Sequence, residues 1–334
     1  MAWGGRFGRR RFGGLAATAA LGGFSFAAAA ASAPKVALVL TGSISDGGWN
    51  QQAYEGLQRV KAGGAPVAFT ENVKQSDILQ VVRGYADDGY DLVVGHGFQF
   101  GGLFMELGGE YPKQKFFATT FAPSGAVPGN VMFVNTRPYD VAYGIGALAA
   151  LLSTKGGVGL VGGGDNPTQQ NMSKLFKVGA QATVPGIKAF AVVTGDYNDA
   201  AKGRETALAM IGNGADVITH TADLTGIGAI KGAAQAGVTV VGAFSDQTSL
   251  APDRMATSMV NDNARVIELV TAMAAGGTFE GGREWTPAID AVWYPHYRDA
   301  DYNAALVPAE TWARFRAIWA DVTTGKVDTA RYLR

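Results

Sequence analysis

Short apolar segments alternate with helical patterns along most of this 334-residue chain. Near-continuous apolar strands separated by helices are typical of parallel sheets that are covered on both faces. The chain therefore predicts an α/β protein with doubly wound parallel sheets. The predicted strands form two series of four: Val36–Leu40, Val67–Phe69, Leu92–Val94 and Phe116–Ala118, then Val158–Val161, Ala189–Val193, Val217–Thr219 and Val240–Ala243.

The two series also repeat each other. The segment Gly89–His96 resembles Gly214–His220, and the next strand keeps the same offset, with Phe116–Ala118 matching Val241–Ala243. Two matches at one spacing indicate two similar lobes. Two doubly wound lobes leave a cleft at the carboxyl ends of their strands, and a ligand is expected there.

The first 33 residues differ from the rest. Their only charges are four arginines, the last three of them in Arg9–Arg11, and an Ala- and Gly-rich run leads to Ala31-Ser32-Ala33. This pattern predicts a twin-arginine-like export signal that is cleaved near residues 31–33, and hence a periplasmic protein. An uncleaved membrane anchor is the alternative, but alanine and glycine insert poorly into bilayers.

Charge and cysteine content exclude several classes. Removing the four arginines of the leader from the 28 basic residues leaves 24, against 28 acidic residues. This balance gives no electrostatic case for binding nucleic acid or an anionic membrane. The chain has no cysteine, so disulfides, thiolate metal sites, a cysteine nucleophile and a lipid-anchor cysteine are all excluded.

The loop after the first strand carries an unusual set of side chains. Asp46, Trp49 and Asn50 lie between the strand and a helical pattern at Gln51–Lys61. Trp49 is suited to stack on a flat ligand, and the polar pair is suited to read the edge of that ligand. The alternative is that Trp49 only packs on the core.

Two further patterns concern the helices and the end of the chain. Ser76 is a predicted N-cap for a helix with an apolar stripe. Near the end, a helix at Asn263–Ala275, a strand at Ala288–Tyr294 returning to the first lobe, and a helix at Pro308–Thr323 are expected. The predicted division is residues 34–140 plus 262–334 for the first lobe and 141–261 for the second.

The ordered motifs resemble those of one family, the basic membrane proteins (PnrA-like), which are substrate-binding components of ABC importers. The resemblance implies a type I periplasmic-binding-protein fold, with two lobes, several hinge crossings and a buried ligand that is a purine nucleoside or a related planar compound. The motifs that carry it are Lys35–Leu40, Asp46–Gln51, Tyr54–Gly56, Gly89–Phe98, Gly156–Gly164, Gly195–Lys202, Gly214–Ile218, Leu224–Gly226, Ser245–Gln247 and Thr257–Ser258.

The resemblance also implies residue roles. Trp49 and Tyr197 match the family's two stacking aromatics, Asn50 and Asp246 match polar positions, and a loop with Gly97 approaches the cleft. The expected ligand-binding set is Thr41, Ser43, Asp46, Trp49, Asn50, His96, Gly97, Phe98, Tyr197, Thr225, Phe244, Asp246 and Asn261. No catalytic residue, metal or cofactor is expected.

Three departures from the family pattern narrow the ligand. Thr41, Phe244 and Asn261 stand where the family commonly has charged groups, two carboxylates and a lysine, that are suited to sugar hydroxyls. We therefore expect a free nucleobase, or another planar heterocycle, rather than a nucleoside. The expected partners are this small molecule and an ABC permease, with the membrane approached only through the permease.

Two other function classes stay open on the sequence. A sugar-binding or ligand-sensing protein can use the same scaffold, because fold alone does not decide function. A nucleoside hydrolase could use Asp46 and Asp246 as acid and base. The three histidines, His96, His220 and His296, form no metal-binding helix motif, and Gly162–Gly164 lacks the spacing of a phosphate loop.

Overall fold

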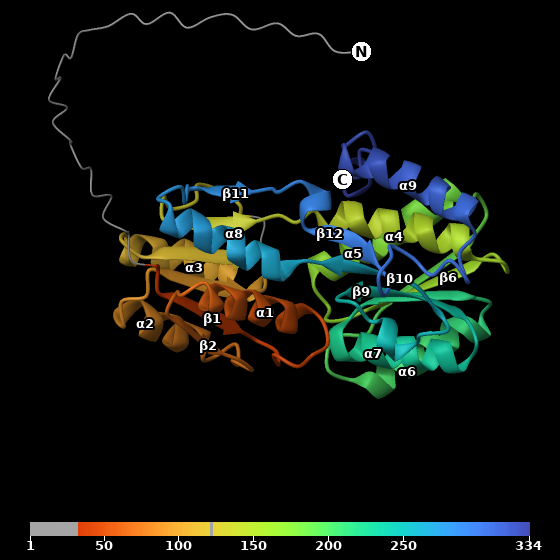
Figure 1. Ribbon diagram of the computed structural model, residues 1–334, viewed down its shortest axis with the longest axis horizontal. Helices are drawn as coiled ribbons and strands as arrows, with labels where there is room; N and C mark the ends of the chain where they lie inside the picture. The colour runs from red at the N-terminus through yellow and green to blue at the C-terminus, as the bar shows by residue number, and fades with distance from the viewer. Residues whose placement is uncertain (1–32, 121–122) are drawn as a thin grey trace, which may run out of the picture. The chain divides into compact units, whose positions relative to one another are not determined.

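The computed structural model describes residues 33–120 and 123–334, so the predicted export signal lies outside the described residues apart from its last position. Two six-stranded sheets make up the core of the described part (Figure 1). The first sheet has the order β11 (Arg283–Trp285), β5 (Val131–Val134), β4 (Lys115–Thr119), β3 (Leu92–His96), β1 (Val36–Leu40), β2 (Val67–Thr70). The second has the order β12 (Trp293–His296), β10 (Met255–Asn261), β9 (Thr239–Phe244), β8 (Val217–Thr221), β6 (Gly157–Gly162), β7 (Lys188–Val193).

Helices cover both faces of each sheet, as the apolar strands require. They are α1 (Trp49–Ala62), α2 (Ile78–Asp87), α3 (Gln99–Glu110), α4 (Pro138–Leu152), α5 (Pro167–Thr183), α6 (Ala200–Gly212), α7 (Asp223–Gln235), α8 (Asn263–Ala275) and α9 (Ala309–Thr323). Alternate residues of β1 divide between two cores: Leu38 packs with Leu57 of α1 and Ile267 of α8, whereas Val39 packs with the α2 and α3 side. The second sheet is covered by α4 and α5 on one face and by α6 and α7 on the other.

The repeat seen in the sequence corresponds to equivalent strands. β3 lies between β1 and β4, and β8 lies between β6 and β9. Strand pairing is parallel throughout both sheets except between β10 and β12. All eight predicted strands are present, which confirms the two-sheet α/β fold predicted from the sequence.

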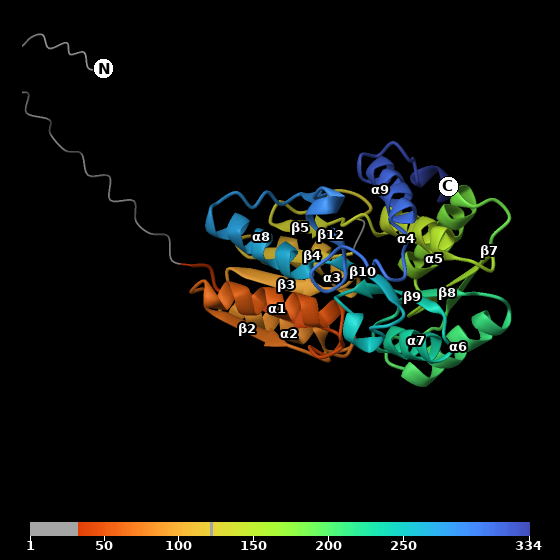
Figure 2. The ribbon, with the colours of Figure 1, turned by 45° about the vertical axis from the view of Figure 1, so that its right-hand side comes forward.

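The chain passes between the sheets at three places: from β5 to α4, from β10 to α8, and from β11 to β12. Helix α8 packs against α1 of the first sheet, whereas α9 packs against α4 beside the second sheet (Figure 2). These crossings place residues 135–137, 262 and 286–292 between the two sheets.

Two predictions from the sequence are wrong. No strand at 288–294 returns to the first lobe: residues Ile289–Ala291 form a short 3-10 turn, and β12 pairs antiparallel with β10 in the second sheet. Pro295 fits there because β12 is an edge strand, where a missing N–H is tolerated. Residues 293–323 therefore lie with the second sheet. Ser76 does not cap α2, because the helix begins at Ile78 and the Ser76 hydroxyl donates to the Asp77 carboxylate.

Within the described ranges, none of the helices is long and apolar enough to cross a membrane.

Candidate ligand-binding site

A cavity of about 390 Å³ lies where the carboxyl ends of strands from both sheets meet. Its lining includes Thr41 after β1, and His96, Thr221, Phe244 and Asn261 at the ends of β3, β8, β9 and β10. This is the place where open α/β sheets bind their ligands, because loops from several strands converge there. Both lobes therefore contribute to one candidate site.

Asp46 organises the loop that leads into α1. Its Oδ1 accepts hydrogen bonds from the backbone N–H groups of Gly48 (2.9 Å) and Gln51 (3.1 Å). Its Oδ2 accepts from the backbone N–H and the side-chain amide of Asn50, both at 2.8 Å. A carboxylate at a helix N-terminus satisfies donors that the helix itself leaves free. Asp46 lines the cavity, but its acceptors are occupied by the protein.

His96 anchors the same loop from the end of β3. Its Nε2 lies 3.0 Å from the Trp49 carbonyl, which can only accept, so Nε2 carries the proton and donates. Nδ1 then accepts from the Thr119 hydroxyl at 3.2 Å, and that oxygen accepts from the Gly97 N–H at 2.8 Å. Burial lowers the pKa of His96 to about 3, so the ring is neutral near pH 7. Both ring nitrogens are used within the protein.

A cluster of aromatic side chains forms one wall of the cavity. The Trp49 ring stacks on the His96 ring with centroids 4.3 Å apart and an interplanar angle of 22°. The Phe244 ring meets Trp49 edge-on at 5.8 Å and lies 6.1 Å from the Trp293 ring. The contacts hold Trp49 in place, so the cavity has a fixed aromatic surface on this side.

Tyr197 supplies a second aromatic from the other lobe. Its ring lies directly over Gly163 and Gly164, where an added Cβ would stand 2.2 Å and 2.5 Å from ring carbons. The Asn166 side-chain amide donates to the Tyr197 hydroxyl at 3.0 Å. Burial raises the pKa of Tyr197, so its hydroxyl stays protonated. The glycines that follow β6 are thus explained by the close approach of Tyr197 rather than by phosphate binding.

Three buried polar side chains in the lining lack partners among the described residues. The Asn50 Oδ1, the Thr136 hydroxyl and both polar atoms of the Asn261 amide have no hydrogen bond. Asn261 is 1% exposed and Thr136 is 4% exposed. Buried polar groups are almost always paired, and an unpaired one costs about 1–3 kcal/mol. Other unpaired atoms lie elsewhere among the described residues, but these four share one cavity, where a polar ligand could pair with them.

Asp223, the first residue of α7, is another unpaired polar group in the lining. Its carboxyl group is half-buried and has no hydrogen bond among the described residues. Burial, together with the nearby negative charge of Asp46, raises the pKa of Asp223 well above its usual value. The sequence reasoning missed this residue, although the adjoining Leu224–Gly226 belonged to the motifs that carried the resemblance.

Backbone strain gathers around the same cavity. Three lining residues other than glycine have positive φ: Thr120 (56°), Asp223 (44°) and Phe244 (69°). Arg137, with φ 58°, lies between two lining residues at the first crossing. Strained conformations of this kind cost about 1–3 kcal/mol each and cluster at ligand sites.

The loop before α1 also touches the second lobe. The Ser245 hydroxyl donates to the Gly47 carbonyl at 2.5 Å. A Cβ added to Gly47 would stand 2.8 Å from the Ile227 Cδ1, and Gly47 has φ 72°. The loop that carries Trp49 is therefore fixed by contacts from both sides of the cavity.

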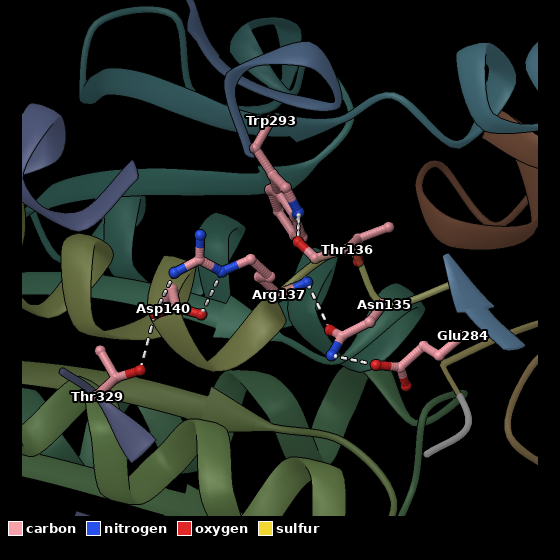
Figure 3. A network of polar contacts seen from close by, with 7 residues as sticks. All are labelled: Asn135, Thr136, Arg137, Asp140, Glu284, Trp293 and Thr329. Atoms are coloured by element: carbon pink, nitrogen blue, oxygen red, sulfur yellow. Dashed lines mark hydrogen bonds and ion pairs between the residues drawn. The ribbon is translucent and has the colours of Figure 1, made fainter. Parts of the chain in front are cut away.

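Polar contacts also fix the first crossing, between β5 and α4 (Figure 3). The Trp293 indole N–H donates to the Thr136 carbonyl at 2.9 Å. Arg137 forms two hydrogen bonds with Asp140, at 3.0 Å and 3.1 Å, and Asp140 accepts from the Thr329 hydroxyl at 2.7 Å. The Thr136 backbone is held in this network, whereas its hydroxyl remains free to meet a ligand.

The family model for ABC transporter substrate-binding proteins of the PnrA-like type matches residues 33–291. The chain belongs to this family. Its members named basic membrane protein include basic membrane protein A2 of Borrelia garinii subsp. bavariensis, which is 29% identical over 254 residues and covers 75% of each chain. The chain is thus an ABC-type solute-binding protein, as its resemblance to the family predicted.

Of two other similar proteins, one is named as a solute-binding protein and the other as a transcriptional activator. A solute-binding protein of an ABC transporter system from Aeropyrum pernix K1 has the same fold, with a TM-score of 0.79 at 18% identity over 88% of this chain and 92% of that chain. The transcriptional activator protein med of Bacillus subtilis is 26% identical over 250 residues, covering 74% of this chain and 77% of that protein. PnrA-like relatives therefore include a protein named as a regulator.

Most of the residues that were expected to bind ligand meet at the cavity. The lining includes Thr41, Asp46, Trp49, Asn50, His96, Gly97, Phe98, Tyr197, Phe244 and Asn261. Ser43 and Thr225 lie outside the lining: the Ser43 hydroxyl meets that of Ser45, and the Thr225 hydroxyl is held between the Asp196 carbonyl and the Asp199 N–H. Lining residues that the sequence reasoning did not select include Lys74, Thr136, Asn166, Gln169, Asp223 and Trp293.

Asp246 also lies outside the lining. Its Oδ1 accepts from the Thr248 N–H and hydroxyl, and its Oδ2 lies 3.7 Å from the His296 Nε2. The carboxyl group that interacts with Asp46 is that of Asp223. The pairing of Asp46 with Asp246 as acid and base is therefore not supported. Within the described ranges there is no cluster of His, Asp and Glu suited to a metal ion.

Proposed function

We propose that this PnrA-like protein captures a small planar heterocycle between its lobes, a purine base or a related ring, and delivers it to an ABC permease outside the cytoplasm. The observation that carries the proposal is the set of unpaired buried polar atoms of Asn50, Thr136 and Asn261, which share one cavity with the rings of Trp49 and Tyr197. Planar rings stack on aromatic side chains, while amide and hydroxyl groups read ring edges.

The size and charge of the cavity support a small ligand without a negative charge. Its volume of about 390 Å³ is at the lower end of the range for ligand pockets, about 300–1,000 Å³. Lys74 is the one lysine or arginine among the described lining residues, and its side chain is exposed. A phosphate or carboxylate would meet Asp46 and Asp223 without a buried cation to offset them. This favours a nucleobase over a nucleotide, and the small number of charged groups among the described lining residues favours it over a sugar.

Capture would work by closure of the two lobes. Trp49 belongs to the first lobe, whereas Tyr197 and Asp223 belong to the second, so a ligand that contacts both stabilises the closed arrangement. The Ser245–Gly47 hydrogen bond and the contact of Ile227 with Gly47 would form as the lobes meet. The permease would then recognise the closed lobe pair.

Calorimetric titration of the purified protein tests the ligand class. Nucleobases, nucleosides, flavins and sugars are first ranked by thermal shift, because a ligand that binds only the native state must raise its stability. We expect free bases to bind more tightly than their nucleosides. Tight binding of adenosine or guanosine without binding of the free bases would contradict the proposal.

A second experiment separates a role in import from a role in sensing. We consider sensing because one relative is named as a transcriptional activator. Cells that lack this chain are expected to lose uptake of the labelled ligand. Normal uptake together with altered transcription would favour the sensing role.

A further inference from the structure

Asp223 differs from Asp46, the other carboxyl group of the cavity, because no described residue donates a hydrogen bond to it. Asp46 accepts four hydrogen bonds from the protein, whereas Asp223 accepts none among the described residues. The charged and titratable groups facing it are Asp46 from the loop before α1 and Tyr197, whose hydroxyl is already held by Asn166. Neither offers Asp223 a cation or a free donor.

The backbone at Asp223 has an uncommon conformation. Its φ of 44° lies in the left-handed region, which glycine adopts readily and most other residues rarely adopt. The Asp223 Oδ1 lies close to Gly48 of the other lobe, since a Cβ added there would stand 3.9 Å from this oxygen. The carboxyl group therefore lies beside the first-lobe loop, at the cavity that Trp49 lines.

Of the remaining unpaired groups, the Asn50 Oδ1 can only accept, whereas the other two accept and donate. The Asn261 amide and the Thr136 hydroxyl, both buried and unpaired, can each donate and accept. An ionised carboxylate can only accept, and an N–H donor of the ligand that pairs with Asp223 favours this ionised form over the protonated one that the cavity otherwise favours. Among the unpaired groups of the lining, Asp223 and the Asn50 Oδ1 can thus distinguish a ligand edge with N–H donors from one with carbonyl oxygens, and Asp223 is the one that can carry a charge.

We propose that Asp223 is a specificity-determining residue that selects ligands presenting an exocyclic amino group over their oxo counterparts. The proposal rests on the proposed function and narrows its ligand class to amino-substituted planar heterocycles. An N–H donor from the ligand would pair with the carboxylate and offset the repulsion from Asp46, and hydrogen bonds to a charged acceptor contribute more than neutral ones. An oxo group would instead face two carboxyl groups.

Two matched pairs of ligands test this inference, cytosine against uracil and adenine against hypoxanthine. Each pair exchanges an amino group for an oxo group at one ring position, and the adjacent ring nitrogen changes from an acceptor to an N–H donor. A preference for the amino member therefore shows that Asp223 meets the exocyclic group. Calorimetry on the full chain is expected to give at least tenfold tighter binding of the amino member in one pair or both. In Asp223→Asn, whose side-chain amide can both accept and donate, the preference is expected to fall below about threefold.

Asp165→Asn is the matched control, because Asp165 is exposed in the same lobe, lies outside the lining, and loses the same charge. It should keep the preference of the unmodified protein. Equal or tighter binding of the oxo member in both pairs would overturn the inference, as would a preference that survives in Asp223→Asn. If bases bind but without this preference, the inference alone fails. If no base or nucleoside binds at all, the proposed function fails with it.

Discussion

Two walls of the cavity differ in whether their polar groups have hydrogen-bond partners within the protein. On the first wall, which we call the satisfied wall, Asp46 and His96 line the cavity, and Thr119 lies behind His96. All three direct their hydrogen bonds to the protein. On the other, the unsatisfied wall, Asp223 and Asn261 have no partner among the described residues. The difference shows which side chains build the site and which remain available to a ligand.

The contrast also explains why Trp49 is a good platform. Its backbone carbonyl accepts from His96, its ring lies on the His96 ring, and it follows directly on Gly48, whose N–H is bound by Asp46. Side chains that are fixed before binding lose little entropy when a ligand arrives. In the function we propose, the satisfied wall would therefore lower the cost of binding, whereas the unsatisfied wall would supply the selectivity.

Lowering the pH should reduce the free energy of unfolding through the buried histidines, one of which belongs to the satisfied wall, and this is the largest effect we expect. Burial lowers the pKa of His96 from 6.5 to about 3, and that of His220 to about 4, so the unfolded chain binds more protons between these values. Stability is therefore lost as the pH falls below 6.5, by about 1.4 kcal/mol per pH unit for each histidine. Urea unfolding at pH 6.5 and 4.5 should show a loss of about 5 kcal/mol from the pair.

Controls separate this effect from other titrations. His96→Gln should remove about half of the loss, whereas His296→Asn, at a site that is 37% exposed, should leave it unchanged. Asp223 works in the opposite sense: its raised pKa contributes stability that is present below pH 3.8 and is lost as the pH rises through the folded-state value. An unfolding free energy that stays constant from pH 6.5 to 4.5, in the protein and in Asp223→Asn, would contradict the prediction.

Removing each of the two cavity carboxyl groups should have opposite consequences for stability. Asp46→Ala leaves four donors at the start of α1 without their acceptor, and we expect a loss of about 2–4 kcal/mol in urea unfolding at pH 7. Asp223→Ala removes no hydrogen bond, so its unfolding free energy should be unchanged or higher. Should Asp46→Ala fail to fold, Asp46→Asn provides the comparison, because its amide keeps only one acceptor. Equal losses at both positions would contradict the distinction between the walls.

The sequence was sufficient for the fold because the strands of doubly wound sheets are local apolar runs. All eight strands expected from such runs are present, as are the helices at residues 263–275 and 309–323. β10 was missed, because buried polar residues such as Thr257 and Ser258 interrupt its apolar pattern. β12 was assigned to the wrong sheet. It pairs with β10 at the edge of the second sheet, and no local sequence pattern encodes which edge strand it joins.

The candidate site, like the fold, could be predicted in part from the sequence. The aromatic and polar residues of the first loop are adjacent in sequence, and motif similarity pointed to Tyr197 in the other lobe. Asp223 could not be found in this way, because the sequence does not show that Asp46 is already occupied and that Asp223 is not. Asp246 was chosen in its place, although the fold directs Asp246 toward Thr248 and His296.

Loss of the Trp49 ring should weaken binding without unfolding the protein. We expect Trp49→Ala to raise the Kd of the best ligand at least tenfold, about 1.4 kcal/mol, because a stacking surface is lost. Trp285→Ala is the matched control, since Trp285 is half-buried in β11 and lies outside the lining. Calorimetry on both variants, with circular dichroism to show that they are folded, is the measurement. Unchanged affinity in Trp49→Ala would place Trp49 outside the ligand site.

The smallest expected effect is that of Thr136, whose hydroxyl is unpaired at the cavity, and Thr119 behind the satisfied wall gives the comparison. Thr136→Val replaces an unpaired buried hydroxyl by a methyl group of similar size, so the ligand-free protein should gain about 1 kcal/mol in urea unfolding. Thr119→Val should instead lose about 2 kcal/mol, because the Gly97 N–H and the His96 Nδ1 are left without their partner. If the Thr136 hydroxyl meets the ligand, the affinity of Thr136→Val falls while its stability rises. A variant with lower stability and unchanged affinity would show that this hydroxyl serves the fold, and Thr136 would then belong with the satisfied wall.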